Sequence, residues 1–398
     1  TLDLGGKTLK RDSDTVLDIY GELTIKNGRI EKGAGGNAVA IWLNNAAKLT
    51  VESDAVVSVS ENAEADCYCI AMWKDCTAAN LTVKGTLKGG SGLTVNGLIV
   101  NTGNTVTIDG ATIEAVNFGI YQAGVSETVI KDSNIKGSTA IEVRAGSMTI
   151  ESGTFTATAT EYKCDPNDNG ATTEGAALAI AQHTTKKDIS VTINGGTFTG
   201  IKALNESNPQ NNNPTPQVTL NVKNGTFNGD VTITDGDQTS ITGGTFSSDV
   251  SAYVPNGYIQ NENGAVETLG ETNAVAKVGD TYYKTLPEAV AAAQNGEATT
   301  ITLLTDVALT NYIYIKDGKN ITLDLNGHTI TRAGNFVFRV GNAKFHVTGE
   351  GTIFEDVTNG FAPILAGGSS TDVAGYTTIT IDENVTLKGD YAGIFVDT

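Results

Sequence analysis

Short alternating runs of apolar and polar residues follow one another along almost the whole chain, and helical periodicity is nearly absent. The runs are rich in Val, Ile and Thr, and each ends at Gly, Asn or Asp, which is typical of short β-strands closed by tight turns. A recurring strand end, often Gly-Thr-Phe, places apolar residues at 30, 87, 113, 135, 155, 198, 227 and 246. Most steps are 19 to 29 residues, and the steps of 43 and 57 indicate two coils, or two coils and a loop.

A second series has the same rhythm. It consists of residue pairs two positions apart, nearly all apolar, at Ile41/Leu43, Ile70/Met72, Leu98/Val100, Ile120/Gln122, Ile141/Val143 and Leu178/Ile180. Both members of a pair face the same side of a strand. Coils of three short strands, stacked about 4.8 Å apart by backbone hydrogen bonds, explain both series, whereas the strand consensus of leucine-rich repeats is missing. The sequence therefore predicts an all-β fold, a right-handed parallel β-helix.

The pattern changes between residues 256 and 300. Thr285-Leu286-Pro287-Glu288 has the form of a capping box, Ala289 to Ala293 continue a helix, and Asn295-Gly296 end it. We expect one short α-helix at about 285–295 that caps the exposed strands at the start of a solenoid. The predicted organisation is a β-helix module over 1–258, a junction with the cap over 259–300, and a second module over 301–398.

The strands after the predicted cap repeat those at the start of the chain. Residues 1–11 align with residues 322–332, and 7 of the 11 positions are identical. Two copies of one module are therefore expected, the first without its cap and the second ending within its series of strands. This organisation is that of a window cut from a longer tandem array, in which neighbouring modules of the same chain are partners.

Two runs carry a family resemblance, Gly243–Val254 and Val278–Ala289. They resemble the module junctions of large secreted or wall-attached surface proteins of Gram-positive, gut-type bacteria, and the coils are similar to the pectin-lyase-like β-helix superfold. The resemblance implies an extracellular location, at the bacterial cell surface or secreted. It implies no single activity, because this fold hosts lyases, hydrolases, phage tailspikes and adhesins alike.

Composition narrows the classes of partner. Asp and Glu outnumber Lys and Arg by 45 to 26, giving a net charge of −19, and no basic cluster is longer than Lys186-Lys187. Nucleic acid and anionic membranes are therefore not expected as partners. No apolar run approaches the ~18 residues of a membrane span. With 3 His and 4 Cys, a His-rich metalloenzyme is not expected either. Calcium is the one cofactor that the sequence suggests.

Outward aromatic residues form the main candidate site. The strand register predicts one face that carries Trp42, Tyr68, Trp73, Asn101, Tyr121, Glu142 and Arg144. Aromatic rings stack on the apolar faces of sugars, while amide and charged groups bond to hydroxyls, so this face predicts binding of a glycan or a host surface protein. The alternative is that an insertion at 156–175 covers these rings.

Four cysteines lie at Cys67, Cys69, Cys76 and Cys164, and their spacing matches no metal motif. A disulfide from Cys76 to Cys69 or Cys67 is one hypothesis, with Cys164 folding back to take the remaining thiol. Four thiols without a disulfide is the alternative, since four cysteines in 398 residues do not make a disulfide scaffold.

The insertion also contains half of a calcium-loop motif. Asp165, Asn167 and Asn169 have the spacing of the first three ligands, and Glu174 lies two residues before the place of the last ligand, which is Ala176. A plain polar loop is the favoured interpretation, because half a motif is weak.

Three carboxylates, Asp109, Asp132 and Glu151, fall at neighbouring turns and are the candidates for catalysis. Glycosidases need two carboxylates about 5 to 9.5 Å apart, but Asp and Asn are also ordinary turn residues, and the turn interpretation is favoured. The preferred hypothesis is therefore an adhesin-like surface module that binds a glycan or a host protein through one face. On this hypothesis enzymatic activity is not expected. A polysaccharide lyase or glycoside hydrolase is the alternative, and a stalk spacer without a ligand is the second alternative.

Overall fold

The computed structural model describes residues 1–35, 39–60, 67–95, 103–168, 170–235, 238–357, 362–367 and 376–397, with the backbone alone at 73–75 and 95. The chain forms two compact units. Unit 1 comprises Thr1–Pro255 with Gln260–Glu267, and unit 2 comprises Asn256–Ile259 with Thr268–Thr398. The boundaries at 258 and 300 that the sequence suggests stay a prediction.

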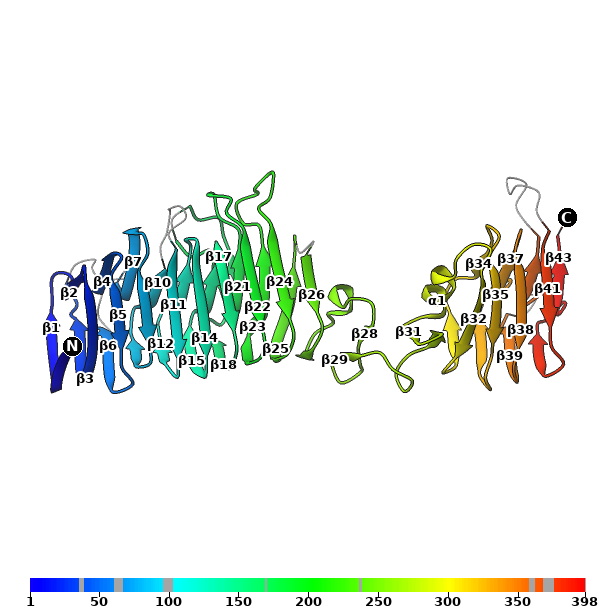
Figure 1. Ribbon diagram of the computed structural model, residues 1–398, viewed down its shortest axis with the longest axis horizontal. Coiled ribbons are helices and arrows are strands. Elements are labelled where there is room, and N and C mark those ends of the chain that lie inside the picture. The colour runs from blue at the N-terminus through cyan, green and yellow to red at the C-terminus, as the bar shows by residue number, and fades with distance from the viewer. Residues whose placement is uncertain are drawn as a thin grey trace. The chain divides into compact units, whose positions relative to one another are not determined.

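Unit 1 is a solenoid with three faces, and successive coils add strands to each face (Figure 1). The first face contains part of β3 (Glu22–Lys32), β5 (Lys48–Val51), β8 (Asn80–Val83), β11 (Asn104–Asp109), β14 (Ser126–Lys131), β17 (Gly146–Ile150), β22 (Ile189–Ile193), β24 (Val218–Val222) and β26 (Gln238–Ile241). The second face contains β1 (Leu2–Arg11), the end of β3, β6 (Ala55–Val59), β9 (Thr86–Lys88), β12 (Thr112–Glu114), β15 (Ser133–Gly137), β18 (Gly153–Ala157), the starts of β23 (Thr197–Ser207) and β25 (Thr226–Ile233), and β27 (Gly244–Phe246).

The third face of unit 1 carries the candidate site. It contains β2 (Leu17–Ile19), β4 (Val39–Asn45), β7 (Tyr68–Cys76), β10 (Ser91–Val95), β13 (Phe118–Gln122), β16 (Thr139–Val143), β21 (Ala176–Ala181) and the ends of β23 and β25. Neighbouring strands on all three faces pair in parallel, as β13 does with β16. Parallel strands joined by crossovers give a right-handed coil. The predicted fold class, a right-handed parallel β-helix, is confirmed.

A stack of phenylalanines fills the later coils of unit 1. The rings of Phe155, Phe198, Phe227 and Phe246 follow one another at 4.8, 4.8 and 4.5 Å between centroids. Each ring lies at the strand end that the first sequence series marks. Gly153, two residues before Phe155, has φ +135°, and a Cβ there would lie 2.3 Å from the Ser133 carbonyl oxygen. The corner of the coil at Gly153 therefore requires glycine.

The two long steps of that series have different explanations. The step of 57 residues contains two coils, because Val57 pairs with both Ile30 and Leu87. The step of 43 residues contains a single coil, because Phe155 pairs directly with Phe198. The additional residues form a connection between β18 and β21, and this connection builds the site described below.

The second series is right in five coils and wrong in one. Ile41, Ile70, Ile120, Ile141 and Leu178 pair from coil to coil as predicted. In the coil between Ile70 and Ile120, Leu93 and Val95 of β10 take these register positions, and Leu98 and Val100 lie outside the described residues. The chain repeats the same Leu-x-Val alternation five residues apart, so spacing alone could not choose between them.

Unit 2 has the same three-faced coil. Its faces contain β32 (Ala298–Leu303), β35 (Asn320–Asp324), β38 (Lys344–Thr348) and β41 (Thr378–Ile381), then β33 (Val307–Leu309), β36 (Thr329–Arg332), β39 (Gly351–Glu355) and β42 (Val385–Lys388), and finally β34 (Ile313–Ile315), β37 (Phe338–Val340), β40 (Ile364–Ala366) and β43 (Ile394–Val396). Outside the coils lie η1 (Ser251–Tyr253), β28 (Tyr258–Gln260), β29 (Ala265–Thr268), β30 (Ala276–Val278) and β31 (Thr281–Tyr283).

The predicted helix is present as α1 (Leu286–Ala292). Thr285 is its N-cap and accepts a hydrogen bond from the Glu288 backbone N–H at 3.2 Å. Leu286 and Ala289 are buried in the same core as Ile301 of β32, the first strand of the coils. The helix therefore covers apolar side chains at the start of unit 2, as expected of a cap.

The sequence repeat corresponds to a repeated structure. In unit 1 the Gly5 N–H donates to Asp3 Oδ1 at 3.0 Å, and in unit 2 the Asn326 N–H donates to Asp324 Oδ1 at the same distance. These residues are equivalent in the alignment, so the two copies close this turn in the same way.

Candidate functional site

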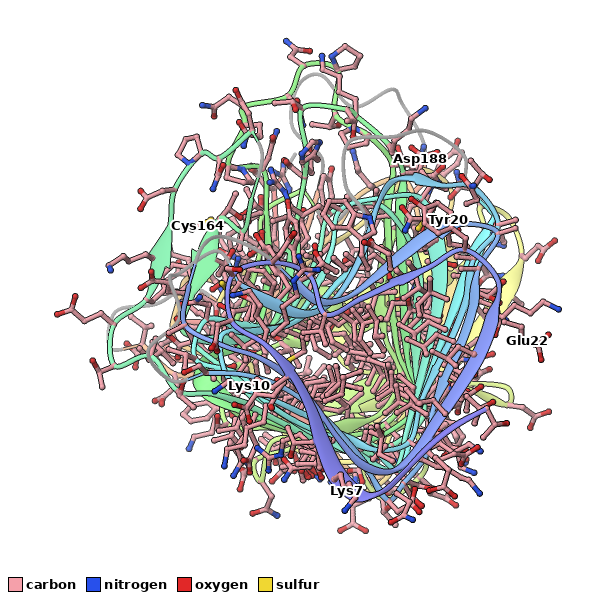
Figure 2. The ribbon with its side chains drawn as sticks, turned by 90° about the vertical axis from the view of Figure 1, so that its left-hand side faces the viewer. Lys7, Lys10, Tyr20, Glu22, Cys164 and Asp188 are labelled. Atoms are coloured by element: carbon pink, nitrogen blue, oxygen red, sulfur yellow. The ribbon has the colours of Figure 1, made fainter. Side chains whose placement is uncertain are left out.

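A long connection between β18 and β21, residues 158–175, lies against the outer side of the third face, and we call it the strap. It contains a short antiparallel pair, β19 (Lys163–Cys164) with β20 (Thr173–Glu174). In the view along the solenoid, Cys164 of β19 lies on the outer side of the ring of strands (Figure 2). Insertions on one face of a solenoid frequently form its binding surface.

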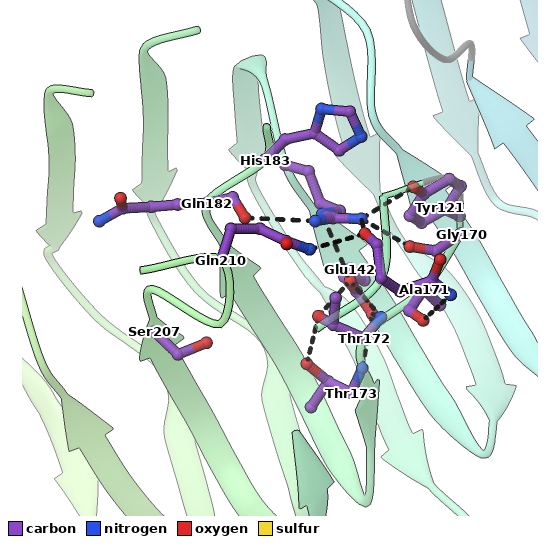
Figure 3. A network of polar contacts seen from close by, with 12 residues as sticks. Tyr121, Glu142, Gly170, Ala171, Thr172, Thr173, Gln182, His183, Ser207 and Gln210 are labelled. Atoms are coloured by element: carbon purple, nitrogen blue, oxygen red, sulfur yellow. Dashed lines mark hydrogen bonds and ion pairs between the residues drawn. The ribbon is translucent and has the colours of Figure 1, made fainter. Parts of the chain in front are cut away.

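Glu142 of β16 anchors the strap. Its side chain points outward, between the inward Ile141 and Val143, yet it is fully buried. The carboxylate accepts hydrogen bonds from the Thr172 N–H at 2.8 Å, the Thr172 hydroxyl at 2.8 Å and the Thr173 N–H at 3.1 Å. One carboxylate thus holds the end of the strap that leads into β21 (Figure 3).

Arg144 holds the middle of the strap and is also fully buried. Its Nη1 donates to the backbone oxygens of Asn167 at 2.8 Å and Gly170 at 2.6 Å, and its Nη2 donates to the Gln182 oxygen at 3.2 Å. Its Nε lies 3.9 Å from Glu142 Oε1. The connection between β23 and β24, residues 208–217, also contacts this cluster, because Gln210 Nε2 donates to the Asn167 oxygen at 2.7 Å.

The electrostatics of this cluster follow from burial. Burial raises the pKa of Glu142, and the neighbouring Arg144 and the threonine donors oppose the shift. Burial also raises the pKa of Tyr121, whose hydroxyl lies 3.4 Å from Arg144 Nη1, to about 12. His183, at the edge of the cluster, has its pKa lowered to about 4 by burial and by the Arg144 charge. The cluster positions the strap.

The predicted ligand-binding face needs correction. Tyr121, Glu142 and Arg144 do lie next to one another, but they are buried under the strap and are not accessible to a ligand. The alternative, that an insertion covers these side chains, is what the structure shows. Trp42 is half-buried on the same face. The side chain of Trp73 and all of Asn101 lie outside the described residues.

Beside the strap, a groove remains open. It has a volume of about 390 Å³ and runs between the strap and the start of β13. One wall is aromatic, because the Tyr68 and Phe118 ring centroids lie 6.0 Å apart and Phe118 lies 5.3 Å from the buried Tyr121 ring. Tyr68 is the member of the predicted face that lines this groove.

Phe118 was not found from the sequence. It is the first residue of β13, and alternation places it on the same side as the inward Ile120. The chain turns a corner here, so the ring is only half-buried and lines the groove. A signal was present in the aromatic residue that precedes the inward pair in two coils, Tyr68 before Ile70 and Phe118 before Ile120.

The opposite wall of the groove is polar. Lys163 and Glu174 pair across the strap at 3.0 Å, and Asp165 and Asn167 complete this side. Asn117 and Thr139 lie at the base. A wall of rings facing hydroxyl, amide and charged groups is able to stack the C–H face of a sugar and bond to its hydroxyl groups.

The half calcium loop has other partners. The Asn167 backbone oxygen accepts hydrogen bonds from Arg144 and Gln210, and Glu174 forms an ion pair with Lys163. Asn169 lies outside the described residues. Within the described ranges, no three His, Cys, Asp or Glu side chains form a metal-binding group. Asp165 is exposed, and the Arg144 guanidinium donates hydrogen bonds to the backbone oxygens of Asn167 and Gly170 in this loop, which favours the polar-loop interpretation.

The disulfide hypothesis is wrong in this structure, where all four cysteines are thiols. Cys76 Sγ donates to the Leu43 oxygen at 2.8 Å, whereas Cys69 Sγ lies 3.4 Å from the Lys88 oxygen in another strand. Cys67 is buried, and Cys164 is half-buried in the strap, 3.5 Å from the Ser207 hydroxyl. Burial raises the pKa of Cys69 to about 12.

The candidate catalytic carboxylates lie at the corner between the first and second faces. Asp132 has φ +47° and accepts a hydrogen bond from the Ser152 hydroxyl at 2.6 Å. Glu151 accepts from Asn194 Nδ2 at 2.9 Å, and Asp109 pairs in register with Lys131. These contacts are those of turn residues, and the strap lies at a different corner.

Comparisons with known proteins add little to this geometry. No family model matches the chain, and no curated protein matches its sequence. Among solved structures, a mutant of the PL6 family alginate lyase AlyGC aligns over 96% of this chain and 73% of its own, with 10% sequence identity and a TM-score of 0.22. A TM-score this low carries no argument about activity. In the described part of the chain, no helix has both the length and the apolar character to cross a membrane.

Proposed function

We propose that this chain is an adhesin-like module of an extracellular bacterial surface protein, and that it binds a neutral glycan without catalysis in the groove beside the strap. The observation that carries the proposal is the groove itself, in which Tyr68 and Phe118 face a polar wall. The extracellular location is supported by the resemblance of the module junctions to those of bacterial surface proteins.

The buried Glu142 and Arg144 support the proposal because they hold one wall of the groove in place. The strap has only one short pair of strands of its own, β19 with β20. Hydrogen bonds to the two buried charges hold it against the third face, together with contacts such as that of the Tyr162 hydroxyl with Asn205 Oδ1 at 2.9 Å. A wall that is ordered before binding loses little conformational entropy when a ligand arrives, and this raises affinity.

The charges at the groove favour a neutral ligand. Lys163 is the cation that lines the groove, and Glu174 pairs with it at 3.0 Å. Asp165 adds a further negative charge. An acidic sugar would meet like charge here, whereas a neutral sugar would use the hydroxyl, amide and carboxylate groups as hydrogen-bonding partners.

The test is a glycan array probed with the purified chain and with Tyr68→Ala and Phe118→Ala variants. We expect neutral glycans among those bound, and at least a tenfold loss of signal for Phe118→Ala because the ring wall is removed. Tyr20→Ala is the matched control, since Tyr20 is 68% exposed and does not line the groove. It should bind like the unmodified chain.

Two results would contradict the proposal. The first is binding that both groove variants retain, since the ligand would then lie elsewhere. The second is release of reducing ends or unsaturated products when the chain is incubated with the bound glycan, which would show an enzyme rather than a binding module. Circular dichroism of each variant checks that the fold is unchanged.

A further inference from the structure

The third face of unit 2 presents an aromatic and basic outer surface. Ile313 and Ile315 are buried, so Tyr314 between them points outward, and strand register places Arg339 next to it. The same outer row continues through Leu365 to Phe395. The corresponding row of unit 1 is Trp42, Ala71, Thr94, Tyr121 and Glu142, of which the last two are covered by the strap.

Cations in this region of unit 2 lie against aromatic rings. The Arg339 guanidinium carbon is 4.8 Å from the Tyr314 ring centroid, and Lys316 Nζ is 5.5 Å from the same centroid. The Arg332 guanidinium carbon is 5.8 Å from the Tyr312 ring, which is 39% exposed. Cation–π contacts usually occur roughly once per 70 to 80 residues, and unit 2 holds four of the five found in the described chain.

The two arginines keep their charge available. Arg339 Nε donates to the Gly367 backbone oxygen at 3.3 Å, and Arg332 donates to the Thr310 and Phe336 backbone oxygens. Within the residues that the structure describes, neither guanidinium has a carboxylate within ion-pair distance. Lys316 pairs with Asp317 at 3.6 Å. In strand register Arg332 lies next to the buried Glu355, whereas Arg339 lies between Tyr314 and Leu365.

A hollow of about 720 Å³ opens beside this surface within unit 2. Pro287 and Val290 of α1 form one side, and Leu309, Tyr312 and Tyr314 form the other. The volume lies in the range of ligand sites, and the apolar sides suit the C–H face of a sugar ring. Lys316, Asp306 and Asp317 also line the hollow, and the two arginines lie outside its lining, against the rings of Tyr312 and Tyr314.

We propose that Tyr312, Tyr314, Lys316, Arg332 and Arg339 form a second carbohydrate site, specific for a glycan that carries carboxylate groups. Tyr312 stacks on a sugar ring in the hollow, and the guanidinium groups of Arg332 and Arg339 bind the carboxylates of that sugar and its neighbour. A planar guanidinium matches a carboxylate with two parallel hydrogen bonds, so arginine suits this role better than lysine. This site differs in charge from the groove of unit 1, and neither proposal depends on the other.

The test is calorimetric titration of the full chain with a galacturonate hexasaccharide and with its methyl ester. The acid should bind at least tenfold more tightly than the ester, and its affinity should fall as salt is raised from 50 to 500 mM, because the attraction is between charges. Tyr312→Ala and Arg339→Gln should each weaken binding of the acid at least tenfold. Arg339→Lys should recover only part of the loss.

Controls distinguish this site from the groove of unit 1. Phe118→Ala and Tyr20→Ala should leave binding of the acid unchanged. Equal binding of acid and ester, no binding of the acid, or a loss caused by Phe118→Ala but not by Tyr312→Ala would overturn the inference. Binding of a sulfated oligosaccharide in place of the uronate would overturn the carboxylate assignment. Tyr312 is exposed, so its variant should fold, and matching unfolding curves would confirm this.

Discussion

Glu142 Oε1 and Arg144 Nε lie 3.9 Å apart under the strap, and both side chains are fully buried although they point out of the solenoid. Glu142 accepts its hydrogen bonds from Thr172 and Thr173 of the strap. Of the four hydrogen bonds that the Arg144 guanidinium donates within the described chain, two go to strap residues, Asn167 and Gly170. The two side chains therefore act in two ways. Their charges attract each other, and their hydrogen bonds hold the strap in place. Removing either charge leaves the other buried without its counterion.

Replacing Glu142→Gln should loosen the strap. The amide keeps the shape of the side chain but leaves Arg144 without a counterion, so we expect a loss of about 3 kcal/mol in the free energy of unfolding. Urea denaturation measures the loss, and trypsin should cut faster after Lys163 in the strap. Glu127→Gln is the control, because Glu127 is exposed on β14. Unchanged cleavage in Glu142→Gln would contradict the anchoring role.

His183 should make stability depend on pH. Its pKa is lowered from the ordinary 6.5 to about 4, chiefly by burial, then by the Arg144 charge, with Asp168 opposing. Between these values the unfolded chain binds a proton that the folded chain does not, so the free energy of unfolding falls as pH drops from 6.5 to 4. The full effect of one such group is roughly 3 kcal/mol.

The comparison that isolates this group is His183→Asn. The Asn oxygen replaces Nδ1, which accepts a hydrogen bond from the Thr185 N–H at 3.1 Å. Urea titrations at several pH values should show a smaller decline in the free energy of unfolding between pH 6.5 and 4 in this variant than in the unmodified chain. Parallel curves for His183→Asn and the unmodified chain would show that His183 does not cause the dependence.

The four cysteines should react with a thiol reagent in two classes. Cys164 is half-buried in the strap and should be labelled slowly in the native protein, whereas Cys67, Cys69 and Cys76 are buried and should react only after unfolding. Titration in denaturant without reductant should count four thiols, and Cys164→Ser should remove the native signal. A count of two would restore the disulfide hypothesis.

The phenylalanine stack should dominate the stability of the later coils. Phe198 contacts a ring on each side at 4.8 Å, so Phe198→Ala should cost about 4 kcal/mol in the free energy of unfolding. Phe246→Ala, at the end of the stack with one ring neighbour at 4.5 Å, should cost less. Equal losses in chemical denaturation would show that burial alone, and not the stack, sets the stability.

Local patterns predicted most of the fold because a β-helix repeats local rules. Alternation decides which residues face inward, and Gly153 and its equivalents lie at the corner where a strand of the second face begins. The cap helix was predicted from Thr285 and Glu288 because an N-cap acts within one turn of helix. The pattern failed between Ile70 and Ile120, where two Leu-x-Val alternations compete in the sequence and only strand pairing with the neighbouring coils places Leu93 and Val95 in register.

The candidate site was predicted only in part. Alternation placed Tyr121 and Glu142 side by side on the outer face, and the structure has them in that register. Whether they are accessible depends on the strap, whose position is set by contacts between residues 23 to 31 positions apart, such as Arg144 with Asn167 and Glu142 with Thr173. The groove beside Phe118 exists for the same reason.

The sequence by itself thus determined the coil, its repeat and its cap, since each depends on residues within one or two turns of chain. Tertiary structure alone decided which outward side chains meet solvent, because an insertion that is merely polar in sequence becomes a covering layer once Glu142 and Arg144 hold it. The physical reason is the cost of burying charge. Two ions on an outer face stay in water unless other parts of the chain replace that water with hydrogen bonds, and the strap provides them.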